Sequence, residues 1–353
     1  MNIQWQLIDQ PGIHVSSNTS SISSMSAILF DQPGDATEVL RWGKAPLPSP
    51  SAEQVRISVS VRVIQPADLL FVAGRYRVKP EYPQVAGFDG AGVVDAVGPG
   101  VDAKWVGRRV AFRSPGAWAD HAVAPVSRVY AVPDDIDDEF ACQFPLNPLT
   151  AWGLLDMASL APGAHVLATA GESMMSRFLT ALAIAQGISL TLVARTGSGT
   201  SASGYRVWKA TGADAAEATG DTLASVLQAA APAGGFQAVL DAVGGPATID
   251  LFSVAATGAT VLSYGVLDDR PFEIKASTLV YRNLRWQGFG IDDYLKKLTP
   301  QQVAASSETL WQLVRSQPSL LAPARSYPIA DFAIAIAGLK QTAKEGRTLL
   351  TSY

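Results

Sequence analysis

Strands and helices alternate along the middle of the chain, and this alternation limits the possible folds more than any other feature. Apolar runs predict strands at His165–Ala170, Ser189–Ala194, Ala238–Val243, Ala259–Tyr264 and Leu284–Phe289. Helical patterns lie between them at Arg177–Ala185, Tyr205–Thr211, Leu223–Ala230 and Thr248–Ala256. Because parallel strands need long crossover connections, which are usually helices, the alternation predicts an α/β domain with a doubly wound parallel sheet.

Residues before and after this region carry a different pattern. Period-two alternation and short apolar runs predict strands at Gln54–Val63, Val106–Phe112 and Trp118–Ala124, which indicates a small all-β domain. The end of the chain adds the helical patterns Pro300–Ser316 and Ile329–Thr342 and a final strand, Arg347–Thr351. We assign residues 25–145 and 291–353 to one domain and residues 146–290 to the other.

Composition excludes several classes of protein. A net charge of −4 over 353 residues argues against a nucleic-acid or anionic-membrane partner. Cys142 is the single cysteine, so the chain forms no internal disulfide and no cysteine-rich zinc site. No apolar run reaches the roughly 18 residues of a membrane span, and residues 1–24 lack the pattern of a signal peptide. We expect a cytoplasmic protein in which residues 1–24, rich in serine, are a disordered extension or a product of start-site choice.

The segment Val85–Gly100 combines clustered glycines with an apolar strand and a closing Gly-Pro-Gly turn. It resembles the segment of medium-chain dehydrogenase/reductases that usually reads Gly-His-Glu-x-x-Gly, in which the histidine of the alcohol dehydrogenases binds zinc. Phe88 stands at the histidine position here, and Asp89 stands where the family has glutamate. Ile64-Gln65 lies where the first cysteine ligand would be. We therefore expect no catalytic metal.

The resemblance runs from about Met25 to the C-terminus and is to the zinc-independent quinone oxidoreductase and enoyl reductase branch of that superfamily. It implies a GroES-like β-barrel domain interrupted by a Rossmann domain, and a homodimer. It also implies NADPH-dependent reduction of an activated C=C bond in an enoyl thioester or α,β-unsaturated carbonyl. Two alternatives stay open: an NADPH:quinone oxidoreductase, and a nucleotide-binding or structural protein that has lost the chemistry.

Two residues of the β domain are the candidates for catalysis. In the enoyl reductases that the chain resembles, a Gly-x-Tyr motif carries the proposed proton donor, and Gly74-Arg75-Tyr76 matches it. A hydroxyl can protonate or stabilise the enolate that hydride addition leaves, so Tyr76 is the candidate acid. The alternative is an aromatic residue that only shapes the pocket. Gln65 belongs to Gln65-Pro66-Ala67-Asp68, which resembles the Asn-Pro-Ala-Asp turn of the family.

The first loop of the Rossmann domain is where the pyrophosphate of a dinucleotide is expected. Ala170, Gly171, Ser173 and Ser176 are its candidate contacts, and Ser176 can cap the helix and donate to phosphate. Met174 and Glu172 suit a phosphate poorly, which leaves open a degenerate domain without cofactor.

Arg195 follows the second strand, where an NAD enzyme would carry an acidic residue for the ribose. An arginine there can pair with the 2′-phosphate of NADPH, and a solvated surface arginine is the alternative. The resemblance implies further cofactor contacts at Asn147, Thr150, Val243, Gly244, Tyr264, Gly265, Phe289 and Arg347.

Overall fold

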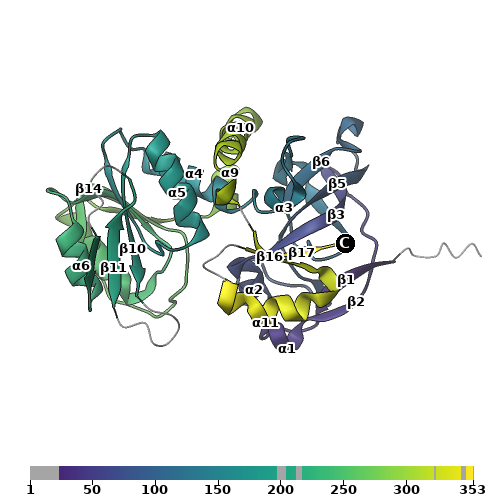
Figure 1. The fold of residues 1–353 in the computed structure, drawn as a ribbon, viewed down its shortest axis with the longest axis horizontal. Coiled ribbons are helices and arrows are strands. Elements are labelled where there is room, and N and C mark those ends of the chain that lie inside the picture. The colour runs from purple at the N-terminus through teal and green to yellow at the C-terminus, as the bar shows by residue number, and fades with distance from the viewer. Residues whose placement is uncertain (1–23, 197–203, 212–216, 322, 343–346, 353) are drawn as a thin grey trace, which may run out of the picture.

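The computed structural model describes residues 24–352 except 197–203, 212–216, 322 and 343–346. In Figure 1 the purple N-terminal part and the yellow C-terminal part of the chain lie in the same half of the molecule, and the middle of the chain forms the other half. The extension predicted for residues 1–24 lies outside the described residues, except for Ser24, the first residue of β1.

The first half is built of strands that pair antiparallel, except for the parallel pair of β16 and β17. A small sheet of order β2-β1-β4 lies beside a larger sheet of order β16-β17-β3-β5-β6-β8, in which β7 also pairs with β3. These strands are β1 (Ser24–Phe30), β2 (Arg41–Pro46), β3 (Gln54–Ile64), β4 (Gln84–Val85), β5 (Asp89–Val97), β6 (Arg109–Arg113), β7 (His121–Pro125), β8 (Val129–Ala131), β16 (Pro323–Pro328) and β17 (Arg347–Thr351). The helices of this half are α1 (Ala36–Val39), α2 (Pro66–Val72), α3 (Asp138–Ala141) and α11 (Phe332–Thr342).

The alternation in β3 and the glycines of β5 explain how these two strands pair. Val55, Ile57 and Val59 point into the core and are at most 3% exposed. A Cβ added to Gly92 would lie 2.1 Å from the carbonyl oxygen of Ser58 on the neighbouring strand. Glycine is therefore required where β5 crosses β3 this closely.

The second half contains one sheet of order β12-β11-β10-β9-β13-β14-β15. The pairs from β10 through β9, β13 and β14 to β15 are parallel, as expected for a doubly wound domain. The strands are β9 (His165–Ala168), β10 (Ser189–Arg195), β11 (Tyr205–Lys209), β12 (Glu217–Gly220), β13 (Phe236–Asp241), β14 (Ala255–Ser263) and β15 (Arg285–Gly288). The predicted fold class, an all-β domain joined to a doubly wound α/β domain, is confirmed.

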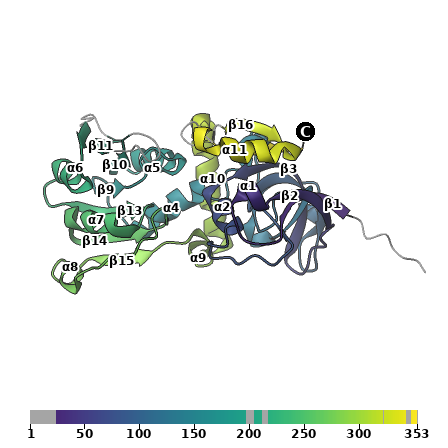
Figure 2. The same ribbon diagram turned by 90° about the horizontal axis from the view of Figure 1, so that it is seen from below.

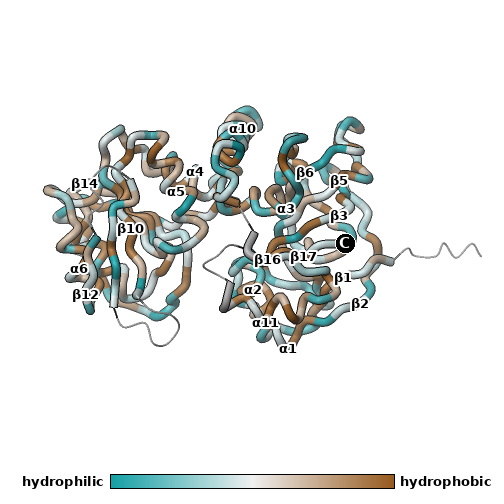
Figure 3. The backbone as a smooth tube through the Cα atoms, in the orientation of Figure 1, coloured by the Kyte–Doolittle hydropathy of each residue, from teal (hydrophilic) through white to brown (hydrophobic). Residues whose placement is uncertain are grey.

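Helices cover both faces of this sheet. The helices of this part of the chain are α4 (Asn147–Ala158), α5 (Met174–Ala185), α6 (Leu223–Ala230), α7 (Thr248–Val254), α8 (Ala276–Val280), α9 (Ile291–Leu295) and α10 (Pro300–Ser316), and α4 to α7 are the ones that pack on the sheet. Side chains of α4 and α5 share one core with Val166 and Leu240, whereas α6 and α7 share another with Leu167 and Val239. Figure 2 shows the layers edge on, and in Figure 3 the hydrophobic colours concentrate on the inner strands. No helix in the described ranges is long and apolar enough to span a membrane.

One predicted element was of the wrong type. Tyr205–Thr211 was expected to be a helix, but β11 runs antiparallel to β10 there. Val207 is buried in the sheet core while its neighbours are only partly buried, which is the period of a strand. No helix or strand was predicted for residues 291–298, where the structure forms the short helix α9 at Ile291–Leu295.

Candidate active site

A buried ion pair lies at the centre of the β domain. Asp89 begins β5, Arg113 ends β6, and the two residues are direct partners in the antiparallel register. The Nη1 atom of Arg113 lies 2.5 Å from Oδ2 of Asp89, and the residues are 6% and 0% exposed. Burial disfavours the charged guanidinium, but Asp89 more than offsets this, so the pKa of Arg113 is raised and the cation is permanent. Burial raises the pKa of Asp89, and Arg113 opposes that shift.

Tyr76 lies against this pair, at the turn that follows α2. The Nη2 atom of Arg113 donates a hydrogen bond of 3.2 Å to the phenol oxygen of Tyr76. The ring of Phe88 packs against both residues: its centroid is 5.2 Å from that of Tyr76, and the guanidinium of Arg113 lies 5.0 Å above it. The residue that replaces the zinc-binding histidine of the resembled family therefore supports an arginine and a tyrosine.

A pocket of about 270 Å³ opens onto these groups. Its lining comes from the turn after α2, the end of β6, the region around β7 and α9: Tyr76, Arg77, Val78, Phe88, Arg113, Ser114, Pro115, Pro125, Arg128, Asp292 and Lys296. This cavity is here called the substrate pocket, after the role proposed for it below. Asp292 pairs with both Arg77 and Arg128 at one side of it. A phenol, a fixed cation and an aromatic ring at one wall can bind a flat acceptor and meet charge that develops on its oxygen.

Gln65 lies behind the pocket wall, away from the pocket itself. Its Nε2 donates to Asp89 at 3.0 Å, and its backbone N–H donates to Asp68 at 2.7 Å. Burial, and then repulsion from Asp89, raise the pKa of Asp68 to about 8. Gln65 thus joins two buried carboxyl groups and is not among the residues that line the cavity.

The loop after β9 contains the four residues predicted to contact a pyrophosphate. Ala170 adopts a left-handed conformation (φ of 54°), and the N–H of Gly171 donates to Val193 at 2.9 Å. Ser173 is the N-cap of α5, since its Oγ accepts from the N–H of Ser176 at 3.3 Å. The hydroxyl of Ser176 is buried against the carbonyl oxygens of Gly171 and Ser173, so it shapes the loop rather than facing outward.

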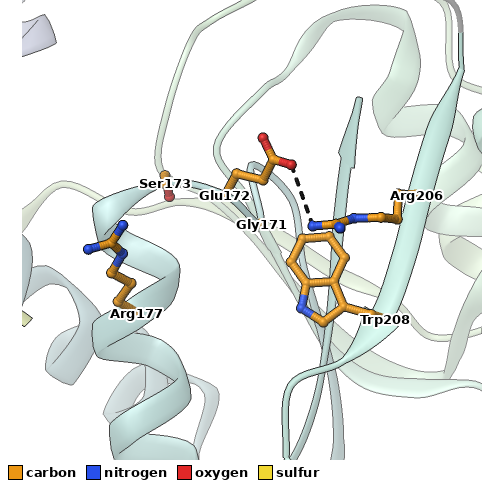
Figure 4. Close-up of a pocket in the computed structure, with 6 residues that line it drawn as sticks. All are labelled: Gly171, Glu172, Ser173, Arg177, Arg206 and Trp208. Atoms are coloured by element: carbon orange, nitrogen blue, oxygen red, sulfur yellow. Dashed lines mark hydrogen bonds and ion pairs between the residues drawn. The ribbon is translucent and has the colours of Figure 1, made fainter. Parts of the chain in front are cut away.

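A cavity of about 310 Å³ lies above this loop, here called the loop pocket. Gly171, Glu172, Ser173, Arg177, Arg206 and Trp208 line it (Figure 4). Arg206 lies 4.4 Å above the Trp208 ring and 3.4 Å from the carboxylate of Glu172. Met174 is buried in the core instead, which removes one objection to phosphate binding. Two arginines and a helix start suit a dinucleotide phosphate, so the residues present fit this cofactor.

The strand ends next to this loop are held by one buried carboxylate. Asp241 accepts hydrogen bonds from the hydroxyl of Thr169 and from the N–H groups of Val243 and Gly244. Beside them, a Cβ added to Gly265 would lie 2.3 Å from the carbonyl oxygen of Ala242. Tyr264 follows β14 with a pKa raised by burial. The predicted contacts Val243, Gly244, Tyr264 and Gly265 thus gather at the carboxyl edge of the sheet.

The other predicted cofactor residues are spread more widely. Asn147 and Thr150 are buried in the first turn of α4, and the Thr150 hydroxyl has no hydrogen-bond partner among the described residues. Arg195 is exposed at the end of β10 and does not line the loop pocket. Phe289 packs in the core beside Tyr294, with ring centroids 5.6 Å apart. Arg347 belongs to the β domain, where its buried guanidinium interacts with Asp68 and Asp89.

Sequence reasoning missed Arg113, Arg206 and Trp208. Arg113 could have been noticed in the sequence, because a charged residue directly after the apolar run Val110–Phe112 indicates a charge at the end of a buried strand. Arg206 and Trp208 were hidden by the incorrect helix, which concealed that they share one face of a strand. In the described part of the chain, no three His, Cys, Asp or Glu side chains gather as a metal site. Burial raises the pKa of the Cys142 thiol well above its usual value and keeps it protonated.

Comparison with known proteins places the chain among oxidoreductases. Residues 51–134 match the alcohol dehydrogenase GroES-like domain family. The mitochondrial enoyl-[acyl-carrier-protein] reductase of Bos taurus is 27% identical over 349 residues, covering 93% of this chain and 89% of that protein. A mycobacterial quinone oxidoreductase structure superposes with a TM-score of 0.77 at 26% identity, covering 93% of this chain and 99% of that one. A mycobacterial structure in complex with NADPH gives a TM-score of 0.76 at 26% identity and the same coverage, 93% and 99%.

Proposed function

Because this chain belongs to the medium-chain dehydrogenase/reductase superfamily, in its quinone oxidoreductase and enoyl reductase branch, we propose that it reduces an activated C=C bond with NADPH. The substrate is an enoyl thioester or an α,β-unsaturated carbonyl, and no metal takes part. The proposed assembly is a cytoplasmic homodimer. The observation that carries the proposal is the phenol of Tyr76 at the wall of the substrate pocket, hydrogen-bonded to Arg113.

The nicotinamide cofactor supplies the hydride when it is bound, and the residues of this chain do the remaining work. The loop around Gly171 and Ser173 holds the pyrophosphate, with Arg177 and Arg206 as the nearby cations. Gly244 and Gly265 let the backbone lie against the cofactor, and Thr150 offers its hydroxyl to the nicotinamide. Arg195 and Arg206 are the two candidates for the 2′-phosphate, on which preference for NADPH depends.

Hydride addition to the β-carbon of the substrate leaves an enolate. The hydroxyl of Tyr76 delivers the proton that completes the reduction, and solvent later restores it. Because the Tyr76 oxygen accepts a hydrogen bond from Arg113, its own O–H must point away from that guanidinium. Tyr76 is therefore oriented to donate.

A Tyr76→Phe variant tests the proposal. We expect turnover of a crotonyl thioester to fall by about 10²-fold or more, as for loss of a general acid. Turnover is followed by the loss of NADPH absorbance. Unchanged enoyl reduction in the variant would refute the role of Tyr76.

Quinone reduction is the second candidate, supported by the likeness to the mycobacterial quinone oxidoreductase. A quinone accepts hydride without needing a positioned acid, so Tyr76→Phe should leave benzoquinone reduction largely intact. A wild-type enzyme that reduces benzoquinone but no enoyl substrate would favour this candidate. Titration with NADPH and NADH by thermal shift tests both, because a ligand at about 100 times its dissociation constant adds about 2.7 kcal/mol. Absence of stabilisation by either cofactor would refute both reductase functions.

A further inference from the structure

We propose that Arg113 is a second catalytic group: its guanidinium and the Tyr76 hydroxyl together form an oxyanion site that binds the carbonyl oxygen of the substrate. This inference rests on the proposed reductase function and extends it. It assigns the pocket to acceptors that gather negative charge on an oxygen atom during reduction.

The first observation is that the Arg113 cation reaches the substrate pocket although it is almost entirely buried. Arg113 lines the cavity with only 6% of its surface exposed. Its hydrogen bonds within the described residues go to Asp89 and Tyr76, whereas a guanidinium carries five N–H donors. A cation in such a dry wall acts on a nearby oxyanion far more strongly than a cation in water does.

The second observation is how rigidly the cation is held. Asp89 fixes one edge of the guanidinium and Phe88 supports its face. Gln65 in turn holds Asp89 through a 3.0 Å hydrogen bond. The group does not need to reorganise when charge appears on the substrate, which is the condition for electrostatic catalysis.

The third observation concerns the balance of charge and protons. Hydride converts the C=C–C=O unit to an enolate, whose new lone pair resides mainly on oxygen. Arg113 stabilises this charge without giving up a proton, and the Tyr76 O–H transfers its proton to the α-carbon or to oxygen. Arg113 therefore lowers the barrier to hydride arrival, and Tyr76 completes the reduction.

Binding of 4-nitrophenol to the NADP⁺-loaded protein tests this inference without turnover. The phenolate mimics the enolate oxygen and is coloured, so absorbance reports which form is bound. We expect the wild type to bind the phenolate at least about tenfold more tightly than the phenol, equal to a fall of about one pKa unit in the bound probe. Arg113→Met should abolish this preference, and Arg113→Lys should restore part of it.

The Asp89→Asn variant separates electrostatics from structure. If Arg113 serves only to hold the fold together, Asp89→Asn and Arg113→Met both break the ion pair and should weaken phenolate binding to the same extent. If it acts as a cation on the ligand, Asp89→Asn removes a competing anion and strengthens phenolate binding, opposite in sign to Arg113→Met. Equal effects of the two variants would overturn the inference.

The same assay tests whether other charged residues around the pocket account for the phenolate preference. Arg77, Arg128, Lys296 and Asp292 face it from neighbouring elements, and Asp68, Arg347 and Tyr130 lie behind Asp89. Arg128→Met tests the other arginine of the wall: loss of the phenolate preference in that variant, with the preference kept in Arg113→Met, would assign the cation to Arg128 instead. Arg62→Met is the matched control, since Arg62 is also a fully buried arginine but does not line the pocket.

The double variant Asp89→Asn with Arg113→Met, which leaves neither charge buried, covers the case in which Arg113→Met fails to fold. It should fold and still lack phenolate preference, and a preserved preference would refute the inference. Failure of the reductase function is recognised separately. In that case the wild type neither gains stability from NADPH nor reduces either acceptor, whatever its affinity for the phenolate.

Discussion

Asp89 and Arg113 face each other across β5 and β6 as a buried ion pair, and Asp89 directly follows Phe88, which stands at the histidine position of the resembled motif. The pair places a permanent charge in the wall of the substrate pocket. Each buried charge is tolerated only in the presence of the other, so removal of either residue should lower the free energy of unfolding.

Removal of one partner should destabilise the fold strongly. Arg113→Met leaves Asp89 buried without its counter-charge, and we expect the free energy of unfolding to fall by about 3–5 kcal/mol. Urea unfolding measures the change. The double variant Asp89→Asn with Arg113→Met should regain part of the loss, because no unpaired charge remains. The exposed pair Arg41–Asp31 is the control, and Arg41→Met should cost little. A small effect for Arg113→Met would show that Asp89 is neutral in the folded protein.

Asp68 should make stability fall as pH rises. Its pKa of about 8 in the folded protein exceeds the usual 3.8, so between these values the folded state keeps a proton that the unfolded state has lost. This costs stability that grows from about pH 4 to about pH 8 and amounts to a few kcal/mol in order of magnitude.

Asp68→Asn should remove this dependence, since the amide oxygen can still accept the N–H of Gln65. Urea unfolding of both proteins at about pH 5 and about pH 8 gives the comparison. The variant should gain stability relative to the wild type as pH rises. A parallel decline in both proteins would mean that Asp68 is not the group responsible.

Substitutions of Glu172 and Arg206, which are neighbours in the loop pocket, should change the affinity for NADPH in opposite directions. The Glu172 carboxylate lies 3.4 Å from Arg206 and competes with a phosphate for it. We expect Glu172→Gln to tighten NADPH binding and Arg206→Gln to weaken it, each by up to about tenfold for one charge-assisted contact. Nucleotide fluorescence titration gives both dissociation constants.

NADH serves as the matched ligand in that titration because it lacks the 2′-phosphate. A loss confined to NADPH assigns the 2′-phosphate to Arg206, and an equal loss for both cofactors assigns Arg206 to the pyrophosphate. The same titration of Arg195→Gln tests whether the exposed arginine at the end of β10 binds the 2′-phosphate instead. If only Arg195→Gln affects NADPH, the role of Arg206 is refuted.

Gly265 should be irreplaceable at the carboxyl edge of the sheet. A Cβ there would lie 2.3 Å from the carbonyl oxygen of Ala242, so Gly265→Ala must push the ends of β13 and β14 apart. We expect a loss of about 1–3 kcal/mol in stability and a clear loss of NADPH affinity. Gly288→Ala is the control, since its nearest neighbour would be 4.0 Å away. Normal NADPH binding by Gly265→Ala would place the cofactor elsewhere.

The fold could be predicted from the sequence because each half has its own simple pattern: alternation of apolar and polar residues in the β domain, and alternation of strands and helices in the α/β domain. Alternation in β3 and the strand–helix rhythm after His165 both depend on local burial, which a single sequence carries. Tyr205–Lys209 was misassigned for a related reason. Its length suits one helical turn or one strand equally, and only pairing with β10 decides between them.

The site was less predictable because its main contacts are distant in sequence. Tyr76 could be proposed from a motif, but its hydrogen-bond donor Arg113 is brought to it by the register of β5 and β6. Glu172 and Arg206 likewise meet only after β11 has folded back along β10. Strand register is a tertiary property, and no local spacing encodes it.

Asp292 has a wider consequence, because it lies on α9, which follows β15 at the edge of the α/β sheet and precedes the part of the chain that returns to the β domain. Through its pairs with Arg77 and Arg128, this carboxylate fastens the returning segment to the wall of the substrate pocket. Because β15 ends at Gly288, a few residues before Asp292, these ion pairs connect the pocket wall to the edge strand of the α/β sheet over a short stretch of chain.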